Sequence, residues 1–301
     1  MRRQDRNLIV RAQVIRSIRD FFTERGFLEV DTPVRIPANA PEEHIQPVGS
    51  DGMYLHTSPE ICMKRLLARG HKAVFQICRC WRQGERGSRH LPEFLMLEWY
   101  RAGGDYTDLM QDCEDLLLHV VRQCLAATSI SYRGNRIDFH DGMHTLKVTD
   151  AFLDYCGISV TDAVSDGSFD ELMGLRIEPA LPRDKPVILM DYPAQMAALS
   201  RLKRSDPAVA ERFELYVGGL ELANGFSELI DPDEQRRRFY EANRSREAAG
   251  LTGLPLPDRF LDELALMPES AGIALGVDRL VMLCAGEDAI DAVVPFTPEQ
   301  L

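Results

Sequence analysis

The residues of this chain best suited to chemistry are two carboxylates and one amide within an otherwise apolar segment, 219–229. Glu221, Asn224 and Glu228 interrupt a sequence that is typical of a buried strand. A buried charge is destabilising unless a partner compensates it, because desolvation costs several kcal/mol. The segment therefore predicts a nearby cation, which could be a metal ion, a bound amine or an arginine in a structural ion pair.

A second set of polar side chains lies on a predicted hairpin, whose strands 73–82 and 93–101 are joined by a polar loop. Side chains alternate along a strand, so one face of the second strand carries four residues suited to ligand contact: Phe94, Met96, Glu98 and Tyr100. Arg82 lies on the corresponding face of the first strand, next to two small cysteines. We expect either a binding platform here or an internal Arg82–Glu98 salt bridge.

The segment 272–279 combines a bare strand face with the start of a helix. Gly272, Ala274 and Gly276 alternate, so one face carries almost no side chain, and such faces often let a ligand or another backbone approach closely. A helix N-terminus together with Arg279 is a suitable phosphate site. The alternative is tight packing of the helix on the sheet.

The hydrophobic periodicity, together with the glycine, proline and capping residues at the ends of segments, predicts the helices and strands that must position these residues. Helices are expected over 6–25, 58–70, 106–125, 233–248, 258–266 and 277–284. In the second of these helices, Ser58 is expected as the N-cap, Pro59 at the first helical position and Glu60 in the first turn. Besides the hairpin, strands are expected over 27–30, 186–190, 213–217, 220–229 and 273–275, and a loop over 36–52. This order predicts one α+β domain, residues 1–301, with a mostly antiparallel sheet.

Composition excludes several classes of protein. The 301 residues contain no apolar run long enough to span a membrane, and the charged N-terminus is not that of a signal peptide. The seven cysteines are scattered and lack a Cys-x2-Cys spacing, so we expect reduced thiols in a cytoplasmic protein and no zinc site. The net charge of −12 disfavours nucleic acid as the main partner.

Three segments of the chain resemble the sequence motifs of class II aminoacyl-tRNA synthetases of the lysine type. Residues 74–82 together with 90–100 resemble motif 2, residues 272–279 resemble motif 3, and the first helix with Val30–Pro33 resembles the dimer-forming motif 1. The segment around Glu221 and Glu228 also matches the lysine branch. The resemblance covers nearly the whole chain, and it implies a six- or seven-stranded antiparallel sheet flanked by helices and a homodimer.

The resemblance also implies a set of site residues. Catalysis would rest on Arg82, Glu221 and Arg279, with ATP phosphates held by the two arginines, adenine stacked between Phe94 and Arg279, and Mg²⁺ held by Glu214 and Glu221. ATP would also contact Gln83, Gly84, Glu85, His90, Leu91, Leu222 and Gly276. The amino-acid pocket would be formed by Ser58, Pro59, Glu60, Glu98, Tyr100, Asn224, Phe226, Glu228 and Ala274. Because Glu221 and Asn224 have opposite strand parity, we expect a bulge between them.

Within this family the chain resembles the elongation factor P (R)-β-lysine ligases. Lysyl-tRNA synthetases carry an N-terminal OB domain that binds the anticodon, whereas this chain starts at the motif 1 helix, so we expect no such domain and a poor fit to tRNA. Ala274 also resembles the ligases, since the synthetases usually have Gly there; neutral drift is the alternative. The resemblance implies that (R)-β-lysine or lysine is activated with ATP and transferred to a lysine side chain of elongation factor P.

Two positions depart from the family pattern. The chain has Gly84, with Glu85 beside it, where motif 2 has Glu, and Leu91 where the loop usually has Asn. Either Glu85 and backbone groups substitute, or nucleotide binding is weaker. Three other functions remain open: a truncated lysyl-tRNA synthetase that charges tRNA, a non-catalytic paralogue that senses an amino acid, and an enzyme that forms a small amide, although the acidic pocket argues against an acidic substrate.

Overall fold

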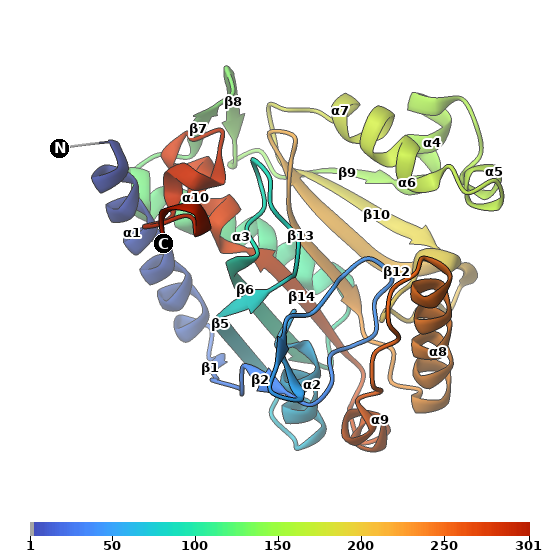
Figure 1. The fold of residues 1–301 in the computed structure, drawn as a ribbon. Helices are drawn as coiled ribbons and strands as arrows, with labels where there is room; N and C mark the ends of the chain where they lie inside the picture. Colours follow the sequence, from blue (N-terminus) through green and yellow to red (C-terminus); the bar gives the residue numbers. More distant parts are fainter. Residues whose placement is uncertain (1–2) are drawn as a thin grey trace.

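One nine-stranded sheet organises residues 3–301, the part of the chain that the computed structural model describes (Figure 1). The strands follow the order β1-β5-β6-β14-β13-β12-β10-β9, and β11 pairs with β12. Their bounds are β1 (Leu28–Glu29), β5 (Ala73–Trp81), β6 (Glu93–Ala102), β9 (His144–Lys147), β10 (Val187–Pro193), β11 (Leu202–Lys203), β12 (Asp206–Val217), β13 (Leu220–Ser227) and β14 (Ser270–Gly276). The central strands are antiparallel, whereas β1 pairs with β5, and β9 with β10, in parallel.

The α+β class and the mostly antiparallel sheet are confirmed, but the sheet has more strands than the six or seven expected. The expected strand 27–30 is present as β1, and the two additional strands, β9 and β11, are only four and two residues long and lie at the edge of the sheet and beside β12. The expected strand 213–217 begins much earlier, at Asp206. Its first residues were missed because they are exposed and lack the hydrophobic alternation that marks a half-buried strand.

The remaining elements surround this sheet. The helices are α1 (Arg3–Glu24), α2 (Glu60–Ala68), α3 (Tyr106–Leu125), α4 (Val148–Cys156), α5 (Val160–Ser165), α6 (Phe169–Leu172), α7 (Glu178–Ala180), α8 (Pro232–Ala248), α9 (Asp258–Leu264) and α10 (Val277–Ala285). Two small sheets are formed by β2 (Arg35–Ile36), β3 (Gly49–Ser50) and β4 (Met53–Leu55), and by β7 (Ser129–Tyr132) and β8 (Asn135–Asp138). The stretch 36–52, expected as a loop, therefore contains strand residues at both of its ends.

The main core lies between the sheet and the helices α1, α3 and α10, which Figure 1 shows on one face of the sheet. Leu97 and Trp99 of β6 point into this core, as their strand parity predicted. On the other face, α2, α8 and α9 pack in a second cluster around Tyr100, and α4–α7 cover β10. No helix within residues 3–301 is both long enough and apolar enough to cross a bilayer, and all seven cysteines are free, as expected.

A bulge in β13 sets the directions in which Glu221 and Asn224 point. Leu215 of β12 pairs with Ala223, but the next residue, Tyr216, pairs with Glu221, so Leu222 is the extra residue. Leu222 and Ala223 both enter the core, which leaves Glu221 and Asn224 on the opposite face. The bulge expected between Glu221 and Asn224 is confirmed, and it lets two residues of opposite parity share one face.

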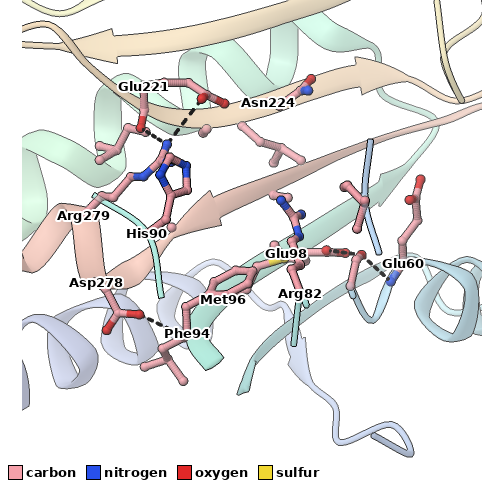
Figure 2. Close-up of a pocket in the computed structure, with 18 of the residues that line it drawn as sticks. Glu60, Arg82, His90, Phe94, Met96, Glu98, Glu221, Asn224, Asp278 and Arg279 are labelled. Carbon is pink, nitrogen blue, oxygen red and sulfur yellow. Dashed lines mark hydrogen bonds and ion pairs between the residues drawn. The ribbon is translucent and has the colours of Figure 1, made fainter. Parts of the chain in front are cut away.

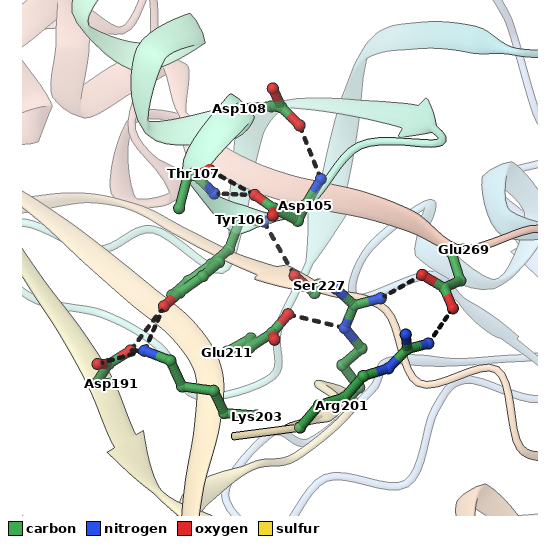
Figure 3. Close-up of polar contacts among 11 residues, drawn as sticks. Asp105, Tyr106, Thr107, Asp108, Asp191, Arg201, Lys203, Glu211, Ser227 and Glu269 are labelled. Atoms are coloured by element: carbon green, nitrogen blue, oxygen red, sulfur yellow. Dashed lines mark hydrogen bonds and ion pairs between the residues drawn. The ribbon is translucent and has the colours of Figure 1, made fainter. Parts of the chain in front are cut away.

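A second irregularity ties the N-terminus of α3 to the sheet (Figure 3). Asp191 lies where the pairing of β10 with β12 shifts, and its φ of 62° is in the left-handed region. Its carboxylate accepts hydrogen bonds from Tyr106 Oη at 2.8 Å and from Lys203 Nζ at 2.9 Å, while Tyr106 N–H donates to Ser227 Oγ at 3.0 Å. These contacts join α3 to β10, β11 and β13 at the end of the sheet.

Candidate active site

One cleft gathers most of the residues that the sequence singled out (Figure 2). It encloses about 330 Å³ on the face of the sheet formed by β6, β14 and β13. The predicted residues that line it are Ser58, Glu60, Arg82, Glu85, His90, Leu91, Phe94, Glu98, Tyr100, Glu221, Leu222, Asn224, Phe226, Ala274, Gly276 and Arg279. Side chains from segments far apart in the sequence therefore converge on one cavity, as expected.

Arg279, in the first turn of α10, forms the cationic end of the cleft. Its Nη1 donates to the backbone oxygen of Glu221 at 2.7 Å and lies 3.3 Å from Glu221 Oε2, and its Nη2 lies 2.5 Å from His90 Nε2. Burial and the neighbouring Arg279 lower the pKa of His90, which favours a neutral ring that accepts this hydrogen bond. The guanidinium is thus held in place from two separate segments before any ligand binds.

Arg82 lies between the two ends of the cleft, where Figure 2 shows its guanidinium pointing into the cavity. Its guanidinium carbon is 5.2 Å from the centre of the Phe94 ring, and its Nη1 is 3.8 Å from Glu85 Oε1. The alternative of an internal Arg82–Glu98 salt bridge is wrong, since no ion pair joins these two within residues 3–301. Gly84 has a φ of 80°, a conformation that few other residues adopt. The carboxylate beside Arg82 comes from the next residue, Glu85.

Glu98 sits at the other end of the cleft and is almost fully buried. Its carboxylate accepts hydrogen bonds from Ser58 Oγ at 2.5 Å and from Tyr100 Oη at 2.7 Å. Burial, with a smaller contribution from Glu60, nevertheless raises the pKa of Glu98 well above its usual value. Helix α2 begins at Glu60 with Pro59 as its N-cap, so Ser58, expected as the N-cap, lies one residue earlier; its Oγ still accepts the Glu60 N–H at 3.0 Å while it orients Glu98.

Lys64 connects the two other carboxyl groups at this end, and sequence reasoning missed it. Lys64 Nζ lies 2.5 Å from both Glu60 Oε1 and Glu228 Oε2. Burial lowers the pKa of Lys64, but Glu228 and Glu60 more than offset this, so the pKa lies above its usual value. Burial raises the pKa of Glu228 to about 8 although Lys64 opposes it. The spacing of Glu60 and Lys64, four residues apart on one helix, was the available signal.

Further carboxylates gather near Glu221. Glu214 accepts hydrogen bonds from Arg212 Nη2 and Tyr216 Oη, each at 2.7 Å, and Arg212 Nε also donates to Asn224 Oδ1 at 3.3 Å. Burial and then Glu214 raise the pKa of Glu221, so the two carboxyl groups interact. Arg212 was missed because the predicted strand began one residue after it.

Comparison with known proteins identifies the family to which this chain belongs. A family profile described as "tRNA synthetases class II (D, K and N)" matches residues 1–300. The chain belongs to this family. Proteins of Salmonella paratyphi B, Salmonella schwarzengrund and Salmonella heidelberg, each named "Elongation factor P--(R)-beta-lysine ligase", are 43% identical over 311 residues, which cover 98% of this chain and 95% of each relative.

Some residues that the class II resemblance implied do not line the cleft: Pro59, Gln83, Gly84, Glu214 and Glu228. Pro59 is buried beneath the start of α2, whereas Gln83 and Gly84 are exposed in the loop after β5. Glu214 lies behind Arg212, and Glu228 is in contact with Lys64. The cleft is instead lined by further residues that the resemblance did not supply, among them Glu42, Arg89, Arg212 and Asp278.

The bare face of the class II motif 3 strand is explained by what lies against it. A Cβ atom at Gly272 would overlap the ring of Tyr100 and the carboxylate of Glu228. A Cβ atom at Gly276 would meet only side-chain carbons of Arg279, at 3.6 Å and beyond. Ala274, between them, pairs with Glu98 on one side and Asn224 on the other. Gly272 therefore makes room for the acidic end, and the methyl group of Ala274 lies between an acid and an amide.

Proposed function

We propose that this member of the class II synthetase family is an ATP-dependent ligase. It activates (R)-β-lysine or lysine as an aminoacyl-adenylate and transfers the aminoacyl group to a lysine side chain of elongation factor P. The names of relatives with 43% identity over 98% of the chain support this amino acid and this acceptor. The structural observation that carries the proposal is one cleft with Arg279 at one end, Glu60 and Glu98 at the other, and Arg82 between them.

The acidic end suits a substrate that carries amino groups. Two carboxyl groups, Glu60 and Glu228, share the ammonium of Lys64, and a third, Glu98, has only the hydroxyl groups of Ser58 and Tyr100 as partners. When all three are ionised, this end retains negative charge that a second ammonium compensates. The raised pKa values of Glu98 and Glu228 describe the empty cleft, and an arriving ammonium lowers them because it favours the charged carboxylates. Asn224 and Phe226, which also line the cleft, complete the proposed amino-acid pocket with Ser58, Tyr100 and Ala274.

In the first half-reaction, a carboxylate oxygen of the amino acid attacks the α-phosphorus of ATP, and pyrophosphate leaves. Arg82, between the two ends, stabilises the negative charge that develops on the α-phosphate, and Arg279 holds the departing phosphates. The nucleotide base stacks on Phe94, with His90, Glu85, Leu91 and Gly276 around it. The guanidinium of Arg279 is effective here because Glu221 and His90 fix it before the reaction begins.

The residues around Glu221 fit a magnesium ion. Glu214 and Glu221 offer only oxygen ligands, the type that Mg²⁺ requires, and burial and then Glu214 raise the pKa of Glu221, so a further cation near both carboxyl groups would stabilise their charged forms. We propose that these two residues hold Mg²⁺. When bound, the ion supplies positive charge to the phosphates of ATP.

In the second half-reaction, the acceptor amine attacks the acyl carbon of the adenylate. A new amide bond forms, the bond between the acyl carbon and the phosphate oxygen breaks, and AMP leaves with the bonding electron pair. The attacking ammonium must first lose a proton. Glu42 lines the cleft, and burial raises its pKa to about 7, so it can accept this proton near neutral pH.

We also propose that the chain works as a homodimer through its motif 1 region. Three of its large apolar side chains, Ile9, Leu28 and Val34, are 39–49% exposed there. Apolar side chains gathered at a surface mark an interaction site. The seven free thiols are consistent with a reducing, cytoplasmic setting, and the net charge of −12 supports a protein acceptor over tRNA.

ATP–pyrophosphate exchange with matched amino acids tests this function. Lysine and (R)-β-lysine should support exchange, whereas norleucine, which has the same chain length as lysine but no terminal amine, should fail. A site built to bind an amine discriminates by about 10⁴-fold against an analogue that leaves its polar groups unpaired. Equal exchange with norleucine, or no exchange with either lysine isomer, would contradict the proposal.

A further inference from the structure

A cluster of soft metal-binding atoms lies beneath the floor of the cleft. A ring nitrogen of His56 and the sulfur atoms of Cys78 and Cys80 all lie within 4.8 Å of one another. The two cysteines come from one face of β5, and His56 follows β4, so the three meet only in the folded chain. The sulfur of Met96 lies 3.9 Å from Cys80 Sγ and adds a thioether.

The orientation of His56 leaves one ring nitrogen free to bind an ion. Its Nε2 is 2.7 Å from the backbone oxygen of Arg79, so Nε2 carries the proton and Nδ1 carries the lone pair. His56 is fully buried, and its Nδ1 has no hydrogen-bond partner. Metal-binding histidines commonly donate their other ring N–H to a carbonyl in this way, which fixes the tautomer and the ring.

The backbone on both sides of His56 is also fixed. Its N–H donates to Val34 O at 2.8 Å, and its carbonyl accepts the Trp81 N–H at 3.1 Å. The second of these bonds connects His56 to the residue that follows Cys80. The position of the ring relative to the two thiols is therefore set by the sheets, as a preformed site requires.

The spacing of the sulfur atoms matches three-coordinate geometry. Cys78 Sγ and Cys80 Sγ are 4.0 Å apart. Two sulfurs bound to one ion at about 2.3 Å, with an angle of about 120° between them, lie about 4.0 Å apart.

We propose that His56, Cys78 and Cys80 form a binding site for a soft d¹⁰ cation, copper(I), with Met96 as a weak additional ligand. Thiolate and thioether ligands favour copper(I), zinc and iron–sulfur clusters among the biological metals, and a thioether suits copper(I) in particular because both are soft. Zinc prefers four strong ligands, and this buried cluster offers three. Cys78 and Met96 are slightly exposed, and Met96 lines the cleft, so the ion enters from the cleft.

Competition with a chromogenic copper(I) chelator, under anaerobic conditions and with the whole protein, tests this site. The wild-type chain should hold one copper(I) with an affinity at least about tenfold to a hundredfold above that of Cys80→Ser and of His56→Gln. Cys62→Ser, which removes a thiol on α2 outside the cluster, should bind like the wild type. X-ray absorption of the loaded protein should give two sulfur neighbours and one nitrogen neighbour.

Each alternative result overturns the inference. Equal affinity of the wild type and Cys80→Ser, or equal loss in Cys62→Ser, would mean that binding is adventitious. Tighter retention of zinc(II) than of copper(I) in a parallel competition would overturn the choice of ion. His56 is fully buried, so the His56→Gln variant can fail to fold. In that case the Cys80→Ser variant, which keeps the size of the side chain, decides whether the site exists.

Discussion

Replacement of Gly272 by alanine should damage the amino-acid pocket selectively. The added methyl group would overlap the Tyr100 ring and the Glu228 carboxylate, so both must move. Tyr100 cannot move freely, because it is almost fully buried and its hydroxyl donates to Glu98 at 2.7 Å. The displacement therefore breaks contacts in the part of the cleft that we assign to the amine of the substrate.

The size of the effect follows from these contacts. Forcing a methyl group into a packed site costs about 1–3 kcal/mol of folding stability. Loss of one hydrogen bond to a charged amine costs about 1.5–3 kcal/mol, and about 1.4 kcal/mol corresponds to a tenfold change in affinity. We therefore expect the KM for lysine or (R)-β-lysine in ATP–pyrophosphate exchange to rise about tenfold to a hundredfold, with the KM for ATP nearly unchanged.

Two other glycines provide matched controls. Gly276→Ala adds a methyl group on the same strand face, where it meets only Arg279 carbons at 3.6 Å and beyond, so amino-acid KM should change little. Gly225→Ala places a methyl group on the core face, 2.8 Å from the Phe213 ring, so it should lower stability but leave the KM unchanged. The reasoning is refuted if Gly272→Ala keeps the wild-type KM, or if Gly225→Ala raises the KM equally.

Three further predictions concern the phosphate end, the specificity and the pH dependence. Arg279→Lys keeps the charge but loses the contacts to Glu221 and His90, so pyrophosphate exchange should fall about 10²-fold; an unchanged rate would remove Arg279 from the mechanism. Ala274→Gly enlarges the space between Glu98 and Asn224 and should shift the ratio of kcat/KM toward lysine over (R)-β-lysine by about tenfold; measurement of both isomers checks this, and a constant ratio contradicts it. The pKa of Glu228 is raised from 4.5 to about 8, so between these values the native state holds a proton that the unfolded carboxyl has released, and the free energy of unfolding falls as pH rises. Glu228→Gln should remove up to about 1.4 kcal/mol per pH unit of that slope, as measured by urea unfolding at several pH values, whereas a parallel slope in both proteins would show that Glu228 does not titrate as described.

The central part of the fold and of the cleft could be predicted from the sequence because its signals are local. The alternation in β6 separated Glu98 from Leu97 and Trp99, and the structure places them on opposite faces. The parity conflict between Glu221 and Asn224 was sufficient to predict a bulge, which the register of β13 confirms. Both faces of the middle of β6 are buried, so there the strict alternation of side-chain direction along a strand, rather than exposure, separated the two sets.

The missed features depend on contacts that no local pattern encodes. Lys64 compensates Glu228, which comes from a strand far along the chain, and the spacing of the cysteines gave no hint of His56, which arrives from another sheet. The Arg82–Glu98 salt bridge was one of two alternatives for two residues on facing strands, but Arg82 lies beyond the end of β5, whereas Glu98 lies opposite Gln76. Distances along the strand direction decide such pairs, and parity alone cannot supply them.

Whether this protein modifies elongation factor P is decided by the mass of the intact factor after incubation with the protein, ATP and (R)-β-lysine. We predict a gain of one β-lysyl group that requires ATP, releases AMP and pyrophosphate, and disappears when the acceptor lysine is replaced. An unmodified elongation factor P, alongside a tRNA that becomes charged under the same conditions, would contradict the account.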